Sequence, residues 1–400
     1  MTELAGWLAG PEGAAAIAAA GRLAGEDPLA AATALRLQLP ALSPARASAA
    51  LTQAALRRTA AQRYGLDRPG LLTRDGLEQA TRPEIARIRA ALIAAARPAR
   101  VVDATAGLGF DTAGLVQAMD PLGIPVIAIE RDPEVATFLR ANVPGAQVME
   151  GDAIEVLPTL HLGPTDLVFV DPARRDRRRS ADGARAQPER DPERWSPPWS
   201  WVVSLASVTR VCAKVSPGFA PDAVPADWCA QWTSWRRTPV EAFACSWPAL
   251  PRSRRAMAAD IDMALDGDGL PPTAIGAVGE WLHEVDPAVV AAGLVDDLIA
   301  QRTGMHRIDT RPYWLSGDAP AVDPLLRSYR VVQELPASPK GQRRALGDHG
   351  IGSVTVKTRG GRRDADRIRT ELHLDGAGAE ATIIVTDVDG RPAAYLVERP

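Results

Sequence analysis

Acidic residues close four short apolar segments between residues 100 and 172. These acids are Asp103, Glu130, Asp152 and Asp171. Carboxylates accept hydrogen bonds from amines and hydroxyls, and they attract cationic groups. A random scatter of charges would not place an acid after every apolar segment. The pattern therefore predicts a site for a ligand that carries both an amino group and hydroxyls.

A turn that contains Gly107 and Gly109 follows the first acid. Its spacing partly matches the dinucleotide-binding pattern G-x-G-x-x-G, but Thr112 occupies the third glycine position. The Asp103 carboxylate would repel a pyrophosphate at a helix N-terminus and would attract an amino group. S-adenosylmethionine carries an amino group and a sulfonium and has no phosphate, and glycines let the backbone approach it closely. We therefore expect S-adenosylmethionine as the cofactor.

The other acids suit the remaining parts of this ligand. Glu130 could accept hydrogen bonds from both ribose hydroxyls, although sites for nicotinamide cofactors also place an acid there. Asp152 could accept a hydrogen bond from the adenine amine. For each acid, a helix N-cap or a solvated loop charge is the alternative reading. The expected cofactor contacts are Asp103, Thr105, Gly107, Gly109, Phe110, Asp111, Glu130, Arg131 and Asp152.

Alternating strands and helices must position these residues. The expected strands cover 101–103, 126–129, 147–150, 167–170 and 210–215, and helices end near 117 and 141. This alternation predicts a parallel sheet wound by right-handed crossovers, whose ligands bind at the carboxyl ends of the strands. Residues 1–96 are expected to be helical. Two apolar runs, 228–235 and 240–247, are expected to form an antiparallel pair at the sheet edge.

The winding pattern is expected to stop after Pro251. A helix is expected over 287–302, and a small α+β unit over 329–398 in the order strand, helix, strand, helix, strand, strand. We therefore expect an N-terminal helical region (1–96), a cofactor-binding α/β domain (97–250), a small linker module (251–322) and a C-terminal α+β domain (323–400).

The motifs resemble those of a known enzyme family. The segment from Asp103 to Gly109 resembles motif I of class I methyltransferases, a Rossmann-like doubly wound fold that binds S-adenosylmethionine. Asp171-Pro172-Ala173-Arg174 stands where amino-methylating members carry Asp/Asn-Pro-Pro-Tyr. The Asp-Pro-Ala-Arg-Arg form resembles a bacterial group with a helical N-terminus and a C-terminal THUMP-like domain. Residues 284–293 resemble the small ferredoxin-like module of that group. The resemblance covers roughly residues 85–400 and implies methylation of an RNA base amine.

Methylation of a base amine requires positioning and desolvation of a weak nucleophile. Asp171 could accept the N–H of the amine, and the carbonyl of Pro172 could share this task. Arg174 replaces the aromatic residue that would stack on the base, and its guanidinium could stack or grip a phosphate. We therefore expect Asp171, Pro172 and Arg174 to be catalytic. The sequence leaves open which ring stacks on the base, with Phe110, Trp195 and Trp199 as candidates.

Basic residues next to this motif suit a polyanionic partner. The chain has only three lysines among its 46 basic residues, and coding bias explains most of the arginines. A cluster of arginines follows Asp171 directly, and a rare lysine stands near further arginines in the last domain. THUMP-type domains bind structured RNA, so the resemblance favours RNA as the partner. The expected nucleic-acid contacts are Arg175, Arg177, Arg178, Arg179, Lys357 and Arg359.

Composition excludes several other classes of protein. A formal net charge of -3 excludes a polybasic chain, and 46% hydrophobic residues exclude wholesale disorder. The three cysteines lie far apart, which argues against zinc sites and disulfides and favours Cys212 as a core residue. No apolar run is long enough to span a membrane, and the first residues lack the positive region and apolar core that are expected of a signal peptide. We expect a cytoplasmic protein without a metal, and the oligomeric state stays open.

Three other functions remain as alternatives. The chain could methylate a protein or a small molecule, or it could be a cofactor-binding RNA adaptor without catalysis. A nicotinamide-dependent enzyme is a more distant alternative, because no histidine stands near the expected strand ends to act as an acid in hydride transfer.

Overall fold

The computed structural model describes residues 2–23, 25, 27–65, 69–173, 189, 191–302, 304–359 and 364–399. The chain divides into two compact units. The first comprises Met1–Val215 and Phe243–Ala249, and the second comprises Ser216–Ala242 and Leu250–Pro400. The boundaries of the four domains expected from the sequence remain predictions.

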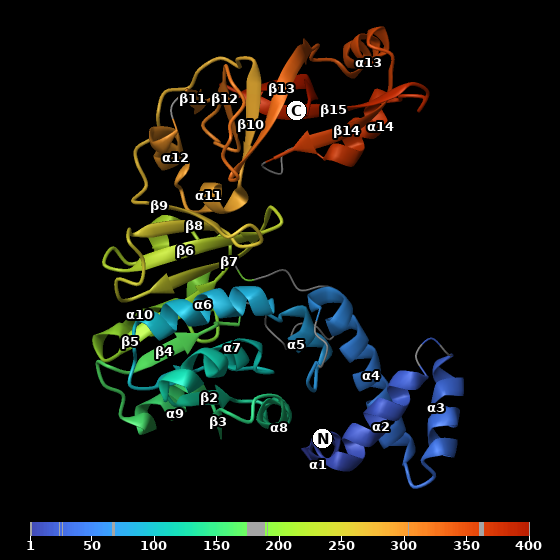
Figure 1. Cartoon of the computed structure of the whole chain (residues 1–400), viewed down its shortest axis with the longest axis vertical. Helices are drawn as coiled ribbons and strands as arrows, with labels where there is room; N and C mark the ends of the chain where they lie inside the picture. The colour runs from blue at the N-terminus through green and yellow to red at the C-terminus, as the bar shows by residue number, and fades with distance from the viewer. Residues whose placement is uncertain are drawn as a thin grey trace. The chain divides into compact units, whose positions relative to one another are not determined.

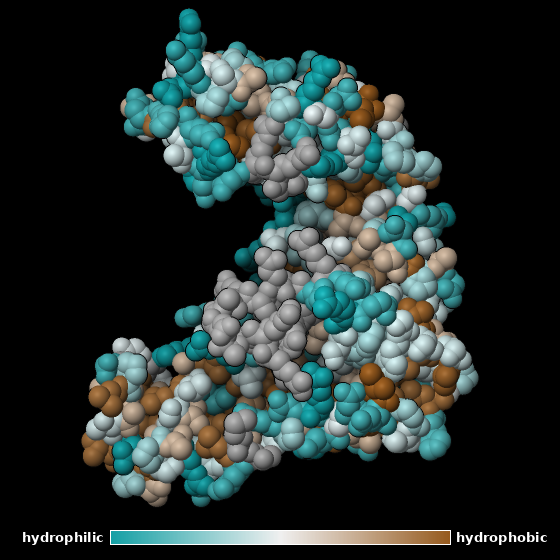
Figure 2. All heavy atoms as spheres, turned by 180° about the vertical axis from the view of Figure 1, so that it is seen from behind, coloured by the Kyte–Doolittle hydropathy of each residue, from teal (hydrophilic) through white to brown (hydrophobic). Residues whose placement is uncertain are grey.

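The described residues before Ala96 are mostly helical, as expected from the sequence, and belong to the first unit (Figure 1). Asp27, Ser43 and Thr73 cap helices through side-chain oxygens that accept backbone N–H groups. Small buried alanines let the helices pack closely, while Figure 2 shows apolar and polar side chains mixed on the surface of this region. The helices are α1 (Thr2–Ala9), α2 (Pro11–Arg22), α3 (Pro28–Gln38), α4 (Pro44–Tyr64), α5 (Arg74–Glu78) and α6 (Pro83–Ala95).

A parallel sheet forms the centre of the first unit, which confirms the expected α/β class. Strand β1 (Val101–Asp103) pairs in parallel with β2 (Val126–Glu130) and β4 (Leu167–Val170). Strand β2 also pairs with β3 (Gln147–Glu150), and β4 pairs with β5 (Arg210–Val215), again in parallel. Every residue of β1, β2 and β4 is buried, as in a sheet covered on both faces.

Helices follow these strands as the alternating pattern predicts. They are α7 (Phe110–Met119), α8 (Pro133–Asn142), α9 (Ala153–Val156) and α10 (Trp199–Ser204). Helix α7 packs against both α6 and β2, and α8 packs against β2, β3 and α1, so the N-terminal helices are attached to the sheet (Figure 1). Short 3-10 helices cover η1 (Asp120–Leu122), η2 (Leu157–Leu160), η4 (Pro192–Arg194), η5 (Leu205–Ser207) and η6 (Pro221–Ala223).

The expectation that the two apolar runs close the edge of the sheet is wrong. These runs form β6 (Cys229–Trp235) and β7 (Thr238–Cys245), but two more strands follow, β8 (Arg254–Ala258) and β9 (Met263–Gly267). Strand β8 pairs in parallel with β6, and β9 pairs with β8 in antiparallel fashion. Among the described residues the strand order is β3-β2-β1-β4-β5-β7-β6-β8-β9. Two arginines open β8, so its apolar pattern is too short to recognise from the sequence.

A second sheet lies wholly within the second unit. Its strands are β10 (Trp281–Val285), β11 (Met305–Arg307), β12 (Trp314–Gly317), β13 (Leu326–Leu335), β14 (Ile351–Thr358), β15 (Ala379–Val388) and β16 (Arg391–Glu398). In the described part of the chain their order is β11-β12-β10-β13-β16-β15-β14, and the pairs are antiparallel except β14 with β15.

The elements of the last segment match the expected order, with helices α13 (Pro339–Asp348) and α14 (Ala365–Leu372) between the strands. The single helix expected over 287–302 is instead two helices, α11 (Pro287–Ala291) and α12 (Val295–Gln301). Gly293 separates them in the left-handed conformation with φ 66°. This conformation interrupts a right-handed helix, and glycine adopts it without steric cost.

Candidate active site

The carboxyl ends of the parallel strands bring the predicted acids to one edge of the sheet. Asp103 and Glu130 are the last residues of β1 and β2, and Asp171 directly follows β4. Asp152 lies just after β3. Lys214, the penultimate residue of β5, stands beside Asp171 because β4 and β5 pair in parallel register.

Asp103 lies beneath this edge with no solvent exposure. Its carboxylate accepts hydrogen bonds from Thr112 Oγ1 at 2.6 Å and from the Thr105 backbone N–H at 3.3 Å. Burial, together with the nearby Asp111 and Asp171 charges, raises the pKa of Asp103 to about 7 despite these hydrogen bonds. A cationic ligand group close to Asp103 would favour its charged form.

The glycine turn adopts backbone conformations that favour glycine. Gly107 has φ 55° and Gly109 has φ 89°. A Cβ on Gly107 would meet no atom within 4 Å, so this part of the turn faces open space. A Cβ on Gly109 would lie 2.6 Å from side-chain atoms of Leu139 and Val143, so only glycine fits there without repacking.

Glu130 fastens the glycine turn to the loop after β2. Its Oε2 accepts the Gly107 N–H at 2.9 Å, and its Oε1 accepts the Asp132 N–H at 2.8 Å. Each carboxylate oxygen can accept more than one hydrogen bond, so these contacts leave acceptor capacity for ligand hydroxyls.

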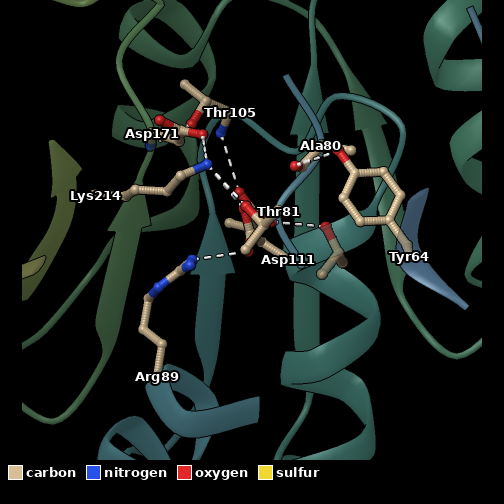
Figure 3. A network of polar contacts seen from close by, with 10 residues as sticks. Tyr64, Ala80, Thr81, Arg89, Thr105, Asp111, Asp171 and Lys214 are labelled. Atoms are coloured by element: carbon tan, nitrogen blue, oxygen red, sulfur yellow. Dashed lines mark hydrogen bonds and ion pairs between the residues drawn. The ribbon is translucent and has the colours of Figure 1, made fainter. Parts of the chain in front are cut away.

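Asp111, at the start of α7, is the centre of a charged network that Figure 3 shows. Its Oδ1 accepts from Arg89 Nη1 at 2.8 Å, and its Oδ2 accepts from Thr81 Oγ1 at 2.9 Å (Figure 3). Lys214 Nζ lies 3.6 Å from the same Oδ2. Burial alone would raise the pKa of Asp111, but Arg89 and Lys214 hold it below its ordinary value. The structure therefore uses Asp111, an expected cofactor contact, in an internal ion cluster.

Asp171 shares one cation with this network. Lys214 Nζ lies 2.5 Å from Asp171 Oδ2 and donates a hydrogen bond to it, and the same nitrogen donates to Thr81 Oγ1 at 2.8 Å (Figure 3). The backbone N–H of Asp171 donates to Thr105 Oγ1 at 2.7 Å. Within the described residues Asp171 Oδ1 has no hydrogen-bond partner, so this oxygen is available to a substrate.

The N-terminal helical region contributes directly to this site. Thr81 and Arg89 come from the segment before α6 and from α6 itself. Tyr64, the last residue of α4, donates its hydroxyl to the Ala80 carbonyl at 3.1 Å (Figure 3). Its ring centroid lies 6.3 Å from that of Phe110. Phe110 therefore packs against the helical region, which also contributes Thr81 and Arg89 to the site.

Four other expected residues or candidate rings have internal roles. Asp152 caps α9 by accepting the Ile154 N–H at 2.9 Å, and Arg131 donates to Ser196 Oγ at 3.3 Å. Trp195 and Trp199, two of the rings considered for base stacking, are both buried. Pro172 is buried, and Arg174, Arg175, Arg177, Arg178 and Arg179 lie outside the described residues.

The two expected nucleic-acid contacts of the last segment share an internal partner. Arg359 Nε donates to Glu284 Oε1 at 2.8 Å, and Lys357 Nζ lies 3.4 Å from Glu284 Oε2. Burial alone would raise the pKa of Glu284, which is only 2% exposed, but the two cations hold it below its ordinary value. Lys357 and Arg359 are therefore not free cations on the surface. Their contact with RNA stays a prediction.

Sequence reasoning missed four residues of the network: Tyr64, Thr81, Arg89 and Lys214. Lys214 carried a signal, because it is one of only three lysines and lies inside an apolar strand. The other three are far from the motifs in sequence, and no spacing rule connects them with the strand ends. Cys212, Cys229 and Cys245 are all buried, which agrees with the expected core position of Cys212.

Two family models match parts of this chain, and one relative matches most of it. A family model described as THUMP domain-like matches residues 326–399, and a model for a domain of unknown function matches residues 2–60. An uncharacterized S-adenosylmethionine-dependent methyltransferase of Mycobacterium tuberculosis is 31% identical over 345 residues, which cover 82% of this chain and 90% of that protein.

Two further similarities are more distant. Ribosomal RNA small subunit methyltransferase J of Rhodopseudomonas palustris is 36% identical over 110 residues, which cover 24% of this chain and 47% of that protein. The crystal structure of a candidate methyltransferase from Porphyromonas gingivalis W83 superposes with a TM-score of 0.69 at 19% identity. That superposition covers 96% of this chain and 97% of the other, and it supports the fold.

Two negative findings concern the residues that the structure describes. No helix among them is long and apolar enough to cross a membrane. No group of three or more His, Cys, Asp or Glu side chains in the described ranges could hold a metal ion.

Proposed function

Because the chain belongs to the family of S-adenosylmethionine-dependent methyltransferases with a THUMP-like C-terminal domain, we propose that it methylates a base amine in RNA. The observation that carries this proposal is the Asp171 carboxylate, which Lys214 holds through Oδ2 while Oδ1 has no partner among the described residues. The THUMP-like segment and the partial similarity to a ribosomal RNA methyltransferase support RNA as the substrate.

The residues at the sheet edge fit this cofactor. The open side of the turn at Gly107 admits a ligand close to the backbone. We assign Asp103 to the amino group, Glu130 to the ribose hydroxyls and Asp152 to the adenine amine. Bound S-adenosylmethionine supplies an electrophilic methyl group on a cationic sulfur.

We assign Asp171 the role of activating the base amine. The nitrogen lone pair of such an amine is delocalised into the ring, so the amine is a poor nucleophile. In our proposal Asp171 Oδ1 and the Pro172 carbonyl accept its two N–H groups, which directs the lone pair toward the methyl group. Lys214 fixes the carboxylate through the other oxygen. The proton that the amine loses after methylation passes to Asp171 Oδ1.

The experiment that tests this function is nucleoside mass spectrometry of RNA from a strain that lacks the gene. We expect one methylated nucleoside to disappear and to return when the wild-type gene is restored. Unchanged RNA nucleosides, together with loss of a methylated protein or small molecule, would contradict the proposed substrate. Cofactor binding without methyl incorporation into any fraction would indicate a binding protein instead of an enzyme.

A further inference from the structure

A pocket of about 380 Å³ lies entirely within the second unit, whereas the acids of the candidate active site belong to the first unit. Its lining combines three arginines with two acids and several apolar residues. The charged lining residues are Arg237, Arg327, Arg399, Asp260 and Asp286.

Arg237 enters the pocket from a strained turn. It lies with Arg236 between β6 and β7, and both residues have positive φ, 59° for Arg237 and 49° for Arg236. Two-residue hairpin loops of this kind usually contain Asn or Gly, so arginine costs stability here. Arg237 Nη2 donates to the Glu284 carbonyl at 2.7 Å, while its Nε is buried without a hydrogen-bond partner. A buried guanidinium with an unused donor favours an acceptor from outside the protein.

Arg327 lines the pocket from β13, and Arg399 lines it from the position directly after β16. In the part of the chain that the structure describes, neither has a hydrogen-bond or ion-pair partner. Because unpaired guanidinium groups bind phosphate through forked N–H donors, both suit an anionic ligand.

The acids of the pocket neutralise these three cations only in part. Asp286 is 2% exposed, and its Oδ2 lies 3.7 Å from Arg237 Nη1. Its Oδ1 accepts from Ser234 Oγ at 2.7 Å and from the Ala288 N–H at 2.9 Å. Asp260 is exposed. Three guanidinium groups against two carboxylates leave the lining net positive.

We propose that this pocket binds a phosphate group, with Arg237, Arg327 and Arg399 as its donors. The apolar lining provides surface for the sugar or base attached to that phosphate, through Ile261, Pro320, Pro324 and Leu326. The phosphate belongs either to a nucleic-acid strand or to a free phosphorylated compound. This inference does not rest on methyl transfer, and a binding assay tests it independently.

The experiment is isothermal titration calorimetry of the full chain with inorganic phosphate, cytidine 5′-monophosphate and cytidine. We expect the two phosphate probes to bind and cytidine to bind much more weakly. Arg327→Gln and Arg399→Gln should each weaken phosphate binding about tenfold, the effect of losing one charge-assisted hydrogen bond. Arg344→Gln, an exposed arginine of α13 outside the pocket, removes the same charge and should leave binding unchanged.

A short RNA added to the phosphate complex distinguishes the two sources of phosphate. Displacement of cytidine 5′-monophosphate by RNA supports the pocket with a nucleic-acid phosphate as its ligand. Retention of the nucleotide supports the pocket with a free phosphate compound as its ligand. Equal binding of cytidine and cytidine 5′-monophosphate, or wild-type phosphate affinity in the Arg327→Gln and Arg399→Gln variants, would overturn the proposal.

Discussion

The ammonium nitrogen of Lys214 lies 2.5 Å from Oδ2 of Asp171, which directly follows the neighbouring strand of the parallel sheet. The same nitrogen donates to Thr81 Oγ1 and lies 3.6 Å from Asp111 Oδ2. One cation therefore connects the end of β4 with the first turn of α7 and with the N-terminal helical region. Loss of this cation affects both the orientation of Asp171 and the packing of the helices.

Lys214→Met should reduce both catalysis and stability. Without the ammonium group, Asp171 loses the donor that orients it, and the largely buried Asp111 keeps only one cation. We expect kcat for methyl transfer to fall about tenfold or more, and the free energy of unfolding to fall by about 1–3 kcal/mol. Initial rates and urea denaturation measure the two effects. Lys340→Met, at an exposed lysine of α13, is the matched control, and wild-type kcat in Lys214→Met would refute the positioning role.

The two glycines of the turn should respond differently to alanine. Gly109→Ala adds a Cβ that collides with Leu139 and Val143, so it should lower the free energy of unfolding by about 2–4 kcal/mol. An added Cβ at Gly107 meets open space. Gly107→Ala should therefore lower the free energy of unfolding by only about 1 kcal/mol, because of the positive φ at this position.

Gly107→Ala should nevertheless weaken cofactor binding about tenfold or more, because the added methyl occupies the space next to the proposed ligand. Thermal unfolding and cofactor titration separate the two variants. Gly123→Ala, with φ 66° and open space around it, controls for the backbone cost alone. If Gly107→Ala binds the cofactor as Gly123→Ala does, the ligand does not contact this turn.

Asp103 should give the protein a characteristic dependence of stability on pH. Its pKa is raised from 3.8 to about 7, so the folded state keeps a proton that the unfolded chain releases. The resulting stabilisation is present at low pH and is lost as pH rises through about 7. Asp103→Asn removes this dependence. The free energy of unfolding of the variant, relative to that of wild type, should therefore rise by on the order of 2 kcal/mol between about pH 5 and about pH 8. Chemical denaturation of both proteins measures it, and a constant difference between them would show that Asp103 is charged throughout.

Glu284 should be important for stability, because it is the shared partner of Lys357 and Arg359. Glu284→Gln leaves two partly buried cations without their carboxylate, so the free energy of unfolding should fall by about 3 kcal/mol. Glu398→Gln breaks an exposed ion pair with Arg330, so it should change the free energy of unfolding by less than about 1 kcal/mol. Similar effects of both substitutions on the free energy of unfolding would mean that the buried cluster contributes little to stability.

The parallel sheet could be predicted from the sequence because β1, β2 and β4 are short apolar runs that end at an acid or directly before one. Asp103, Glu130 and Asp171 lie at strand ends for this reason. Strand β8 and the short strands β10–β12 escaped prediction, because charged and polar residues such as Arg254 and Glu284 interrupt their apolar patterns.

The partners of each acid could not be predicted from local spacing. Arg89 reaches Asp111 from 22 positions away, and Thr81 reaches Lys214 from 133 positions away. Tertiary packing of the N-terminal helices brings these residues together. Lys357 and Arg359 looked like a basic surface in the sequence, because their carboxylate partner lies more than 70 positions away on another strand.

The most direct test of the central claim compares Asp171→Asn with wild type in methyl transfer to RNA. Purified protein is incubated with labelled S-adenosylmethionine and RNA from a strain that lacks the gene, and cofactor affinity is measured in parallel. Asp120→Asn, at an exposed position, is the control. We predict that wild type and Asp120→Asn label RNA, whereas Asp171→Asn binds the cofactor with nearly wild-type affinity and labels RNA at least about 100-fold more slowly. Wild-type labelling of RNA by Asp171→Asn would contradict the role assigned to Asp171.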